Sequence, residues 1–219
     1  MVSRTKSTKN PLPPKERKNV VQKIDYKASK LFFDGYNKIA GTNYPLLFLE
    51  ISGHGILWLA LTVYFLLFSD VTSLVQQCAL ANLLTGLVTD LAMVGSAKVA
   101  FRRRRPTYAI SQKQVATVEI VDQFSFPSGH TARVVFVACL ARHCSSGALS
   151  VLSDDSVVVI TTWAALVAWS RLALGRHYIT DVVAGGLIGA ANFELVAGIL
   201  WLSPAVVQVY RGTVLSYIG

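Results

Sequence analysis

Long apolar segments alternate with short polar ones along most of this chain. Four strongly apolar runs occupy residues 46–68, 71–94, 156–174 and 182–203, and a weaker fifth run occupies 131–149. A helix of about 20 apolar residues crosses the hydrocarbon core of a bilayer. The fifth run carries Arg133, Arg142 and His143 toward its ends, so we expect a short helix shielded by its neighbours. The pattern predicts an all-α, polytopic membrane helix bundle of about five spans.

The composition agrees with a membrane protein. The chain has 219 residues, of which 53% are hydrophobic and 15% are charged, and its mean hydropathy is +0.47. These values exclude an ordinary soluble protein, and the length suits one domain. We divide the chain into a basic N-terminal tail over 1–45, a transmembrane domain over 46–203 and a short C-terminal tail over 204–219.

The N-terminal tail carries ten Lys or Arg residues against three acidic ones, and its prolines at 11, 13 and 14 oppose an early helix. We expect the part before Val20 to be disordered. From Val20 to Ile39, apolar residues recur at helical spacing with lysines between them, which is typical of a helix on a membrane surface. A solvated basic helix has the same pattern. The start lacks the apolar core of a cleavable signal peptide, so we expect the first span to anchor the chain.

Three polar clusters lie at the ends of the apolar runs. Five alternating spans bring residues 98–105, 127–130 and 170–181 to one side of the membrane, together with the N-terminus. That side carries nineteen of the 21 Lys and Arg residues, whereas the other side has Arg142 and Arg211 beside Asp70, Asp154 and Asp155. The positive-inside rule therefore assigns the clusters and the N-terminus to the cytoplasm, and the C-terminus to the lumen.

The first cluster contains Lys98 and Arg105. These cations are seven residues apart, which is almost two turns, so both would project from one face of a continuing helix and could grip one anion. Pro106 then ends the segment. The run from Arg102 to Arg105 has a second interpretation as a topology signal facing anionic lipid headgroups.

The second cluster is Pro127-Ser128-Gly129-His130, directly before an apolar run. Unpaired backbone amides and the positive end of a helix dipole favour an anion at such a position. Gly129 has no Cβ to obstruct the anion, Ser128 adds a hydroxyl donor, and His130 would lie near a leaving oxygen. A simple helix cap is the alternative.

The third cluster combines Ser170-Arg171 with His177 and Asp181. His177 and Asp181 are four residues apart and become neighbours on a helix that begins near Arg176. The carboxylate could accept the Nδ1 proton of His177 and leave Nε2 as a free nucleophile. A structural His–Asp pair is the alternative, and the nearby Arg171 favours the functional interpretation.

Several other polar residues lie in or near the apolar runs. Glu50, Asp90 and Glu194 are candidates for a function because exposing a carboxylate to lipid is costly, and Asp90 could pair with a cation of the clusters. Arg133 could touch a headgroup or brace a carboxylate, and we expect His54 to be a packed polar residue. The three cysteines lack metal-ligand spacing, so we expect neither zinc nor a disulfide network.

With these residues assembled, the chain resembles the type 2 phosphatidic acid phosphatase (PAP2) superfamily. Its three signatures match Lys98-x6-Arg105-Pro106, Pro127-Ser128-Gly129-His130 and Ser170-Arg171-x5-His177-x3-Asp181, within residues 46–203. The resemblance implies a lipid phosphatase that needs no metal or other cofactor. It implies the catalytic residues His177, His130 and Asp181 and the phosphate-binding residues Lys98, Arg105, Ser128, Gly129 and Arg171.

The resemblance also implies the order of the chemical steps. His177 attacks phosphorus and forms a phosphohistidine, while His130 protonates the departing oxygen and then helps to activate water. Asp181 orients His177. The cations and the amides of Ser128 and Gly129 hold the nonbridging oxygens.

Two further stretches, Leu174-Gly175-Arg176-His177 and Trp201-Leu202-Ser203-Pro204, resemble the polyisoprenoid diphosphate phosphatase branch. That branch acts on presqualene, farnesyl and geranylgeranyl diphosphates. The usual lipid phosphate phosphatases have six spans, whereas this chain lacks one before Lys98, which implies a site on the cytoplasmic face. The resemblance implies the endoplasmic reticulum and nuclear envelope as its location.

Other functions and partners stay open. A broad lipid phosphate phosphatase acting on phosphatidate-type monoesters, a catalytically silent membrane scaffold and a lipid phosphotransferase are the alternatives. The expected partners are the lipid phosphate or diphosphate substrate and membrane lipids, with no nucleic acid. The glycines between 185 and 189 have a spacing suited to close helix packing, either within the chain or in a homodimer.

Overall fold

Helices make up the regular structure of the described residues, apart from one isolated β-bridge between Arg104 and Phe124. The computed structural model describes residues 19–40, 42–68, 73–109, 124–146 and 151–209. The tail before residue 19, Asp70 and Arg211 lie outside the described residues. In chain order the elements are α1 (Val20–Ile39), α2 (Tyr44–Ser52), α3 (Gly55–Phe68), α4 (Leu74–Phe101), the short 3₁₀ helix η1 (Thr107–Ala109), α6 (Gly129–Ser145), α7 (Asp154–Ala173), α8 (Ile179–Leu195) and the π-helix η2 (Val196–Leu200).

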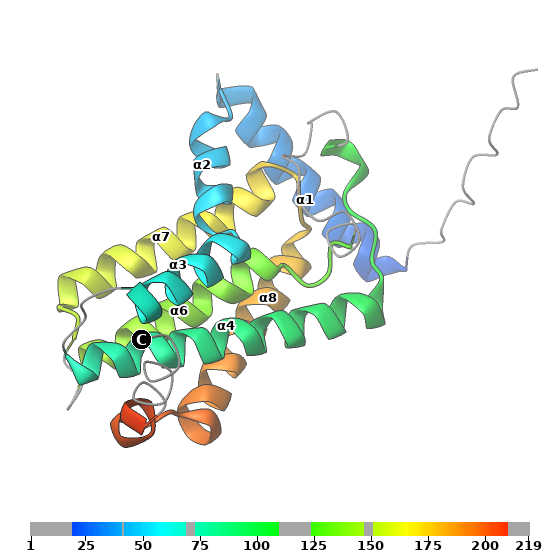
Figure 1. The fold of residues 1–219 in the computed structure, drawn as a ribbon. Helices are drawn as coiled ribbons and strands as arrows, with labels where there is room; N and C mark the ends of the chain where they lie inside the picture. Colours follow the sequence, from blue (N-terminus) through cyan, green and yellow to red (C-terminus); the bar gives the residue numbers. More distant parts are fainter. Residues whose placement is uncertain (1–18, 41, 69–72, 110–123, 147–150, 210–219) are drawn as a thin grey trace, which may run out of the picture.

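Helix α6 lies at the centre of the bundle and packs against α4, α7 and α8 (Figure 1). Its main apolar core consists of Phe136, Val137, Leu140 and Cys144 of α6 with Val196 of η2. Glycine lets α8 approach closely, because a Cβ at Gly189 would lie 2.1 Å from the carbonyl oxygen of Ala132. The neighbours therefore shield α6, as the polar ends of this segment predicted.

Three helices are long and apolar enough to cross a membrane, namely α4, α7 and α8 continued by η2. Helices α2 and α3 would together form a fourth span, bent by 49°. Helix α6 has 17 residues, which is short for a complete span. The predicted all-α membrane bundle is confirmed, whereas the prediction of one continuous helix over 46–68 is wrong.

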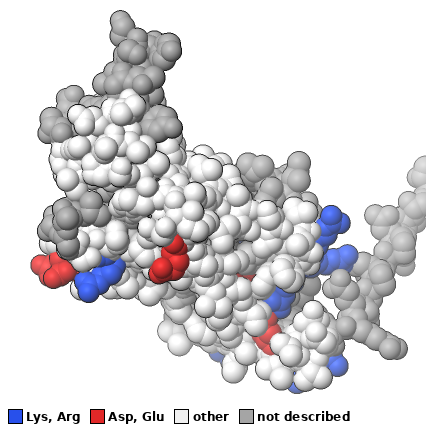
Figure 2. Space-filling model, turned by 90° about the horizontal axis from the view of Figure 1, so that it is seen from below, with Lys and Arg blue, Asp and Glu red and all other residues white. Residues whose placement is uncertain are grey.

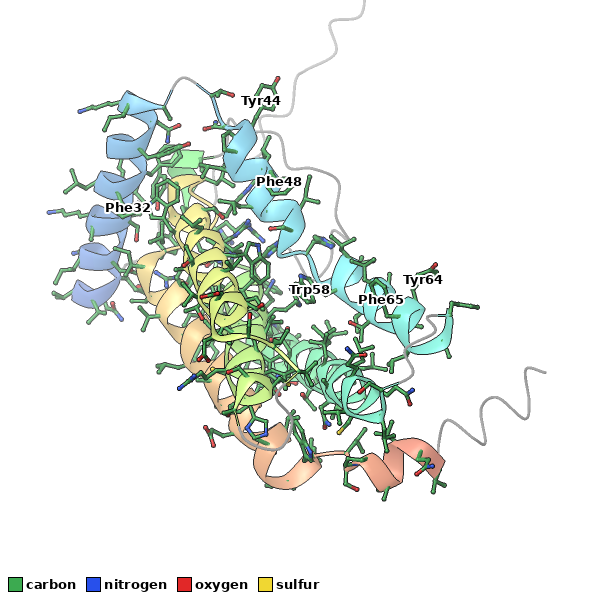
Figure 3. The ribbon with its side chains drawn as sticks, turned by 90° about the vertical axis from the view of Figure 1, so that its left-hand side faces the viewer. Phe32, Tyr44, Phe48, Trp58, Tyr64 and Phe65 are labelled. Carbon is green, nitrogen blue, oxygen red and sulfur yellow. The ribbon has the colours of Figure 1, made fainter. Side chains whose placement is uncertain are left out.

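The break between α2 and α3 is stabilised by one polar side chain from α3 and one from α6. Trp58 Nε1 donates to the Ser52 carbonyl oxygen at 2.7 Å, and Arg133 Nη1 donates to the Gly53 carbonyl oxygen at 3.1 Å. Backbone groups at membrane depth need such partners within the protein. Figure 3 shows the two helices meeting at an angle, with Trp58 beside the break and Tyr44, Phe48, Tyr64 and Phe65 along them.

Helix α1 lies across one end of the bundle, beside η1 and the beginning of α8 (Figure 1). Its polar residues Asp25 and Ser29 are buried, whereas Val21, Ile24 and Leu31 remain exposed. The helix has the predicted bounds, and its lysines at 23 and 27 are exposed like these apolar residues, whereas Asp25 and Ser29 face the protein. The exposed Val21, Ile24 and Leu31 side chains suit contact with lipid.

The charged residues visible in Figure 2 lie mostly toward two sides of the molecule, and the surface seen in this view is largely uncharged. Arg142 and Asp154 form an exposed pair at 3.8 Å, and they lie at the end opposite the N-terminus of α6. A largely uncharged surface suits a protein that crosses a bilayer. The surface therefore agrees with the spans defined by the helices.

Candidate active site

Four helix ends meet at one end of the bundle: the C-terminal ends of α4 and α7 and the N-terminal ends of α6 and α8. Three hydrogen bonds connect them, from the Ser128 amide to the Asp181 carbonyl at 3.0 Å, from His177 Nδ1 to the Ser125 carbonyl at 2.7 Å, and from Arg105 Nη1 to the Arg176 carbonyl at 3.4 Å. The structure thus brings all three predicted clusters together.

His177 lies in the turn between α7 and α8 and is 2% exposed. Its Nδ1 lies 2.7 Å from the Ser125 carbonyl oxygen. A carbonyl oxygen only accepts hydrogen bonds, so Nδ1 carries the proton and the neutral ring keeps its lone pair on Nε2. Asp181 Oδ2 is 3.7 Å from Nδ1, which is beyond a normal hydrogen bond. The hydrogen bond that we expected from Asp181 is made by the Ser125 backbone.

The Asp181 carboxylate is fully buried and has two close partners. Oδ2 accepts from the Tyr178 amide at 2.9 Å, and Oδ1 accepts from Arg103 Nη1 at 2.6 Å. A buried charge of this kind needs partners to remain ionised. The carboxylate therefore places a fixed negative charge near the His177 ring.

The surroundings of His177 keep its imidazole neutral. Burial lowers the pKa of His177 to about 4 from its ordinary 6.5. Asp181 acts in the opposite direction, and the positive charges of Arg105 and Arg171 lower the pKa further. A neutral imidazole with a lone pair on Nε2 is competent as a nucleophile at neutral pH.

Arg171 has two buried donors that are not used within the described part of the chain. The side chain is 2% exposed, and its Nη2 donates to Glu50 Oε1 at 3.0 Å. Nε and Nη1 are buried and make no hydrogen bond within the described part of the chain. Unpaired buried donors of a guanidinium suit the planar, bidentate recognition of phosphate oxygens. Lys98, also buried, lies in the last turn of α4.

Arg105 reaches the site from beyond the end of α4. The expected continuous helix from Lys98 to Arg105 is wrong, because α4 ends at Phe101 and Arg102 adopts a left-handed conformation with φ 45°. The backbone then pairs with another segment, since the Ser125 amide donates to the Arg103 carbonyl at 2.7 Å. Hydrogen bonds to residues 124–125 replace the next helical turn.

Ser128 caps α6 and is fully buried. Its Oγ accepts from Thr131 Oγ1 at 2.9 Å and from the Thr131 amide at 3.4 Å. The hydroxyl therefore acts as a helix cap, while its own proton remains available for donation. A Cβ at Gly129 would lie 3.2 Å from Val94, so this glycine also serves the close packing of α6 on α4.

His130 lies in the first turn of α6, and its Nε2 is 3.1 Å from the Glu50 carbonyl oxygen. Because that oxygen only accepts, Nε2 carries a proton. His54 lies near it, with ring centroids 6.0 Å apart. The break after α2 thus places the His54 imidazole beside that of His130, and nothing in this contact contradicts the expected packing role of His54.

Glu50 is a site residue whose position the sequence did not indicate. Its Oε1 lies 3.0 Å from Arg171 Nη2 and 3.3 Å from Arg176 Nε. A lone carboxylate in an apolar segment was the available signal, but the bend of α2 over the site could not be foreseen. Glu50 partly neutralises two buried guanidinium groups and fixes their orientation.

Asp90 and Arg133 form a separate buried pair at 3.0 Å. Of the two options for Arg133, the structure shows the one in which it braces a carboxylate. Asp90 thus pairs with Arg133, which lies outside the three clusters, and the pair connects α4 and α6. No group of three or more His, Cys, Asp or Glu side chains among the described residues is placed to hold a metal ion.

The fold and the site define a polytopic membrane protein with a buried neutral histidine beside several buried cations. A family model described as the PAP2 superfamily matches residues 79–203, which include all three clusters. The chain belongs to the PAP2 superfamily, and membership supports phosphatase activity toward lipid phosphates.

Individual relatives agree with this assignment. The chain is 35% identical over 166 residues to the "Probable lipid phosphate phosphatase beta" of Arabidopsis thaliana, covering 67% of this chain and 75% of that one. It is 25% identical over 173 residues to the "Undecaprenyl-diphosphatase" of Sulfolobus acidocaldarius, covering 77% and 76%. The crystal structure of a transmembrane PAP2-type phosphatidylglycerolphosphate phosphatase from Bacillus subtilis matches with a TM-score of 0.64 and 26% identity, over 83% of this chain and 87% of that chain.

Proposed function

We propose that this protein hydrolyses isoprenoid diphosphates, such as presqualene, farnesyl and geranylgeranyl diphosphates, through a phosphohistidine on His177. The proposal is carried by two features found in the same cluster. The His177 imidazole is neutral with its proton on Nδ1, and the buried Arg171 has two donors without a hydrogen-bond partner among the described residues. This combination favours attack on a phosphoryl group whose charge the arginine stabilises.

The proposed reaction has two steps. The Nε2 lone pair of His177 attacks the terminal phosphorus, and the bond between that phosphorus and the bridging oxygen breaks. The doubly protonated form of His130 gives one proton to the departing prenyl monophosphate and becomes neutral, and Asp181 stabilises the positive charge that develops on the His177 ring. Water, deprotonated by His130, then attacks phosphorus and releases inorganic phosphate, which restores both histidines.

The nonbridging oxygens need cationic partners in both steps. We assign this task to Lys98, Arg105 and Arg171, with the Ser128 and Gly129 amides at the start of α6. A hydrogen bond to a charged group contributes roughly 1.5–3 kcal/mol, so several such bonds together lower the barrier substantially. No metal takes part in this proposal.

The isoprenoid diphosphate is proposed on two grounds. One relative is named for a prenyl diphosphate, and the stretches at 174–177 and 201–204 resemble the polyisoprenoid branch. A diphosphate head suits a cationic site at the membrane surface, while its apolar tail stays among helices or lipid. The relative named for lipid phosphates supports the second candidate, a broad phosphatase acting on phosphatidate-type monoesters.

One purified preparation should be assayed for phosphate release from the three isoprenoid diphosphates and from phosphatidate. We expect the diphosphates to react faster, with inhibition by vanadate and no inhibition by EDTA. His177→Ala should abolish turnover, and full activity in that variant would refute the assigned nucleophile. Faster hydrolysis of phosphatidate would favour the second candidate, and no turnover at all would favour a scaffold. An added alcohol that receives the phosphoryl group would identify a phosphotransferase.

A further inference from the structure

Helix α1 contributes a buried carboxylate close to the active site. Asp25 is 6% exposed, and its Oδ2 lies 2.7 Å from Arg103 Nη2. Burying a charge is costly unless it is paired. Helix α1 therefore makes a directed polar contact with the catalytic end of the bundle.

Arg103 bridges two carboxylates from different helices. One terminal nitrogen binds Asp25, and the other lies 2.6 Å from Asp181 Oδ1. The guanidinium also lies over the Tyr178 ring, 3.9 Å from its centroid. A planar guanidinium with both nitrogens engaged is held more firmly than one with a single contact. Asp25 is thus connected to Asp181 through one side chain.

Helix α1 also receives the first amides of α8. The Ile179 amide donates to Ser29 Oγ at 2.9 Å, and the Thr180 amide donates to Asp25 Oδ1 at 3.2 Å. The first amides of a helix have no partner inside it. Asp25 and Ser29 supply those partners from another helix, and so determine where the helix carrying Asp181 begins.

We propose that Asp25 and Arg103 are positioning residues for catalysis, through which α1 holds Asp181 and the adjoining His177 in their reactive arrangement. This inference rests on the proposed function. Arg103 lies between Lys98 and Arg105 in the first cluster, and its role differs from theirs: it binds protein carboxylates, not the phosphoryl group. The helix over 20–39, expected to lie on a membrane surface or in solvent, would thereby also position residues of the site.

The variant Asp25→Asn tests the proposal with little change in size. An asparagine side chain cannot pair ionically with Arg103, so we expect kcat to fall about 10- to 100-fold, as for a small misplacement of reacting groups, and KM to change less than about threefold. Asp25→Glu should restore part of the loss. Asp34→Asn is the matched control, because Asp34 lies on the same helix in a surface pair with Lys30. Surface ion pairs contribute little, so we expect this variant to change kcat by less than about twofold.

A double-variant cycle tests the connection itself. If Asp25 acts through Arg103, Asp25→Asn should lower kcat little further in an Arg103→Gln background. If the kcat losses of the two single variants multiply in the double variant, Asp25 does not act through Arg103 and the inference is overturned. Thermal unfolding in detergent should be recorded for each variant, and a loss of kcat that simply follows the folded fraction would also overturn it.

Hydrogen exchange separates this inference from the proposed function. The amides of Ile179 and Thr180 should exchange faster in Asp25→Asn than in Asp34→Asn, whether or not a substrate is known. Unchanged exchange would overturn the inference while leaving the phosphatase proposal intact. An unmodified protein without turnover on any lipid phosphate would overturn the proposed function and the catalytic part of the inference, although faster exchange would still establish that α1 holds α8.

Discussion

A backbone carbonyl determines which nitrogen of His177 is free to react. The Ser125 carbonyl oxygen accepts a hydrogen bond from His177 Nδ1, with 2.7 Å between the two atoms, so Nε2 keeps the lone pair. Asp181 is then free to bind Arg103 and the Tyr178 amide. In the proposed mechanism, orientation and charge stabilisation, which we first assigned to one carboxylate, are therefore divided between the Ser125 backbone and the Asp181 side chain.

The low pKa of His177 leads to a prediction that is independent of substrate. Its imidazole should stay neutral as pH falls from 8 to 5 and should titrate with a pKa of about 4. Between the ordinary pKa of 6.5 and this value, the unfolded chain binds a proton that the folded chain does not. The contribution of His177 to stability is therefore complete above pH 6.5 and is lost progressively as pH falls toward 4.

Nitrogen-15 spectra of labelled histidine, recorded over this pH range, would measure the titration directly. The variant His177→Ala identifies the signal by its disappearance. A titration near 6.5 would contradict the burial that the structure assigns to this ring.

The residue types of the site were predictable from sequence, and their partners were not. Spacing predicted that His177 and Asp181 are neighbours and that Ser128 begins a helix, but the helix expected to begin near Arg176 begins at Ile179, after His177. Ser125 could not be found this way, because a carbonyl oxygen is present at every position and has no sequence pattern. Glu50 likewise reaches the arginines of the third cluster through a bend that the apolar run over 46–68 does not reveal.

At the scale of elements, helix ends have more influence on the site than helix faces. Helix α4 stops at Phe101, so Arg105 approaches on an extended segment and not on the face that carries Lys98. Helix α2 ends at Ser52, which frees backbone carbonyls for Arg133 and Trp58. Hydrophobic periodicity predicted the existence of these helices, but their ends depend on contacts with distant segments.

The contact between α6 and α8 predicts different effects for two glycines of one helix. A Cβ at Gly189 would lie 2.1 Å from the Ala132 carbonyl oxygen, which belongs to the backbone of α6, whereas a Cβ at Gly186 would lie 4.0 Å from Val135. Gly189→Ala should therefore force the helices apart and lower stability by about 1–3 kcal/mol. Gly186→Ala should be neutral or stabilising by up to about 1 kcal/mol, because alanine favours the helix.

Thermal unfolding in one detergent compares the two variants under equal conditions. We expect a lower Tm only for Gly189→Ala. Equal Tm values would show that α8 moves away from α6 at little cost, contrary to the close packing in the structure.

At the scale of the whole molecule, the candidate active site lies at one end of a bundle whose surface is largely uncharged on the face in Figure 2. This position lets a charged head bind at the membrane surface while an apolar tail remains in lipid. The common location of the three clusters was predictable, since it follows from alternating spans. The packing of α1 against α8 was not, because contacts such as that of Ser29 with Ile179 join positions far apart in the chain.

The distribution of positive charge predicts which side of the membrane holds the site. Nineteen of the 21 Lys and Arg residues were assigned to the side of the three clusters, and such a bias favours the cytoplasm. In sealed microsomes, an impermeant maleimide should label Asp34→Cys on exposed α1 without detergent. It should label Asp155→Cys, at the opposite end of the bundle, only after permeabilisation. The unmodified chain is the control, because Cys78 and Cys144 are buried and Cys139 is partly buried. The reverse labelling pattern would place the site in the lumen, where substrate made in the cytoplasm would first have to cross the bilayer.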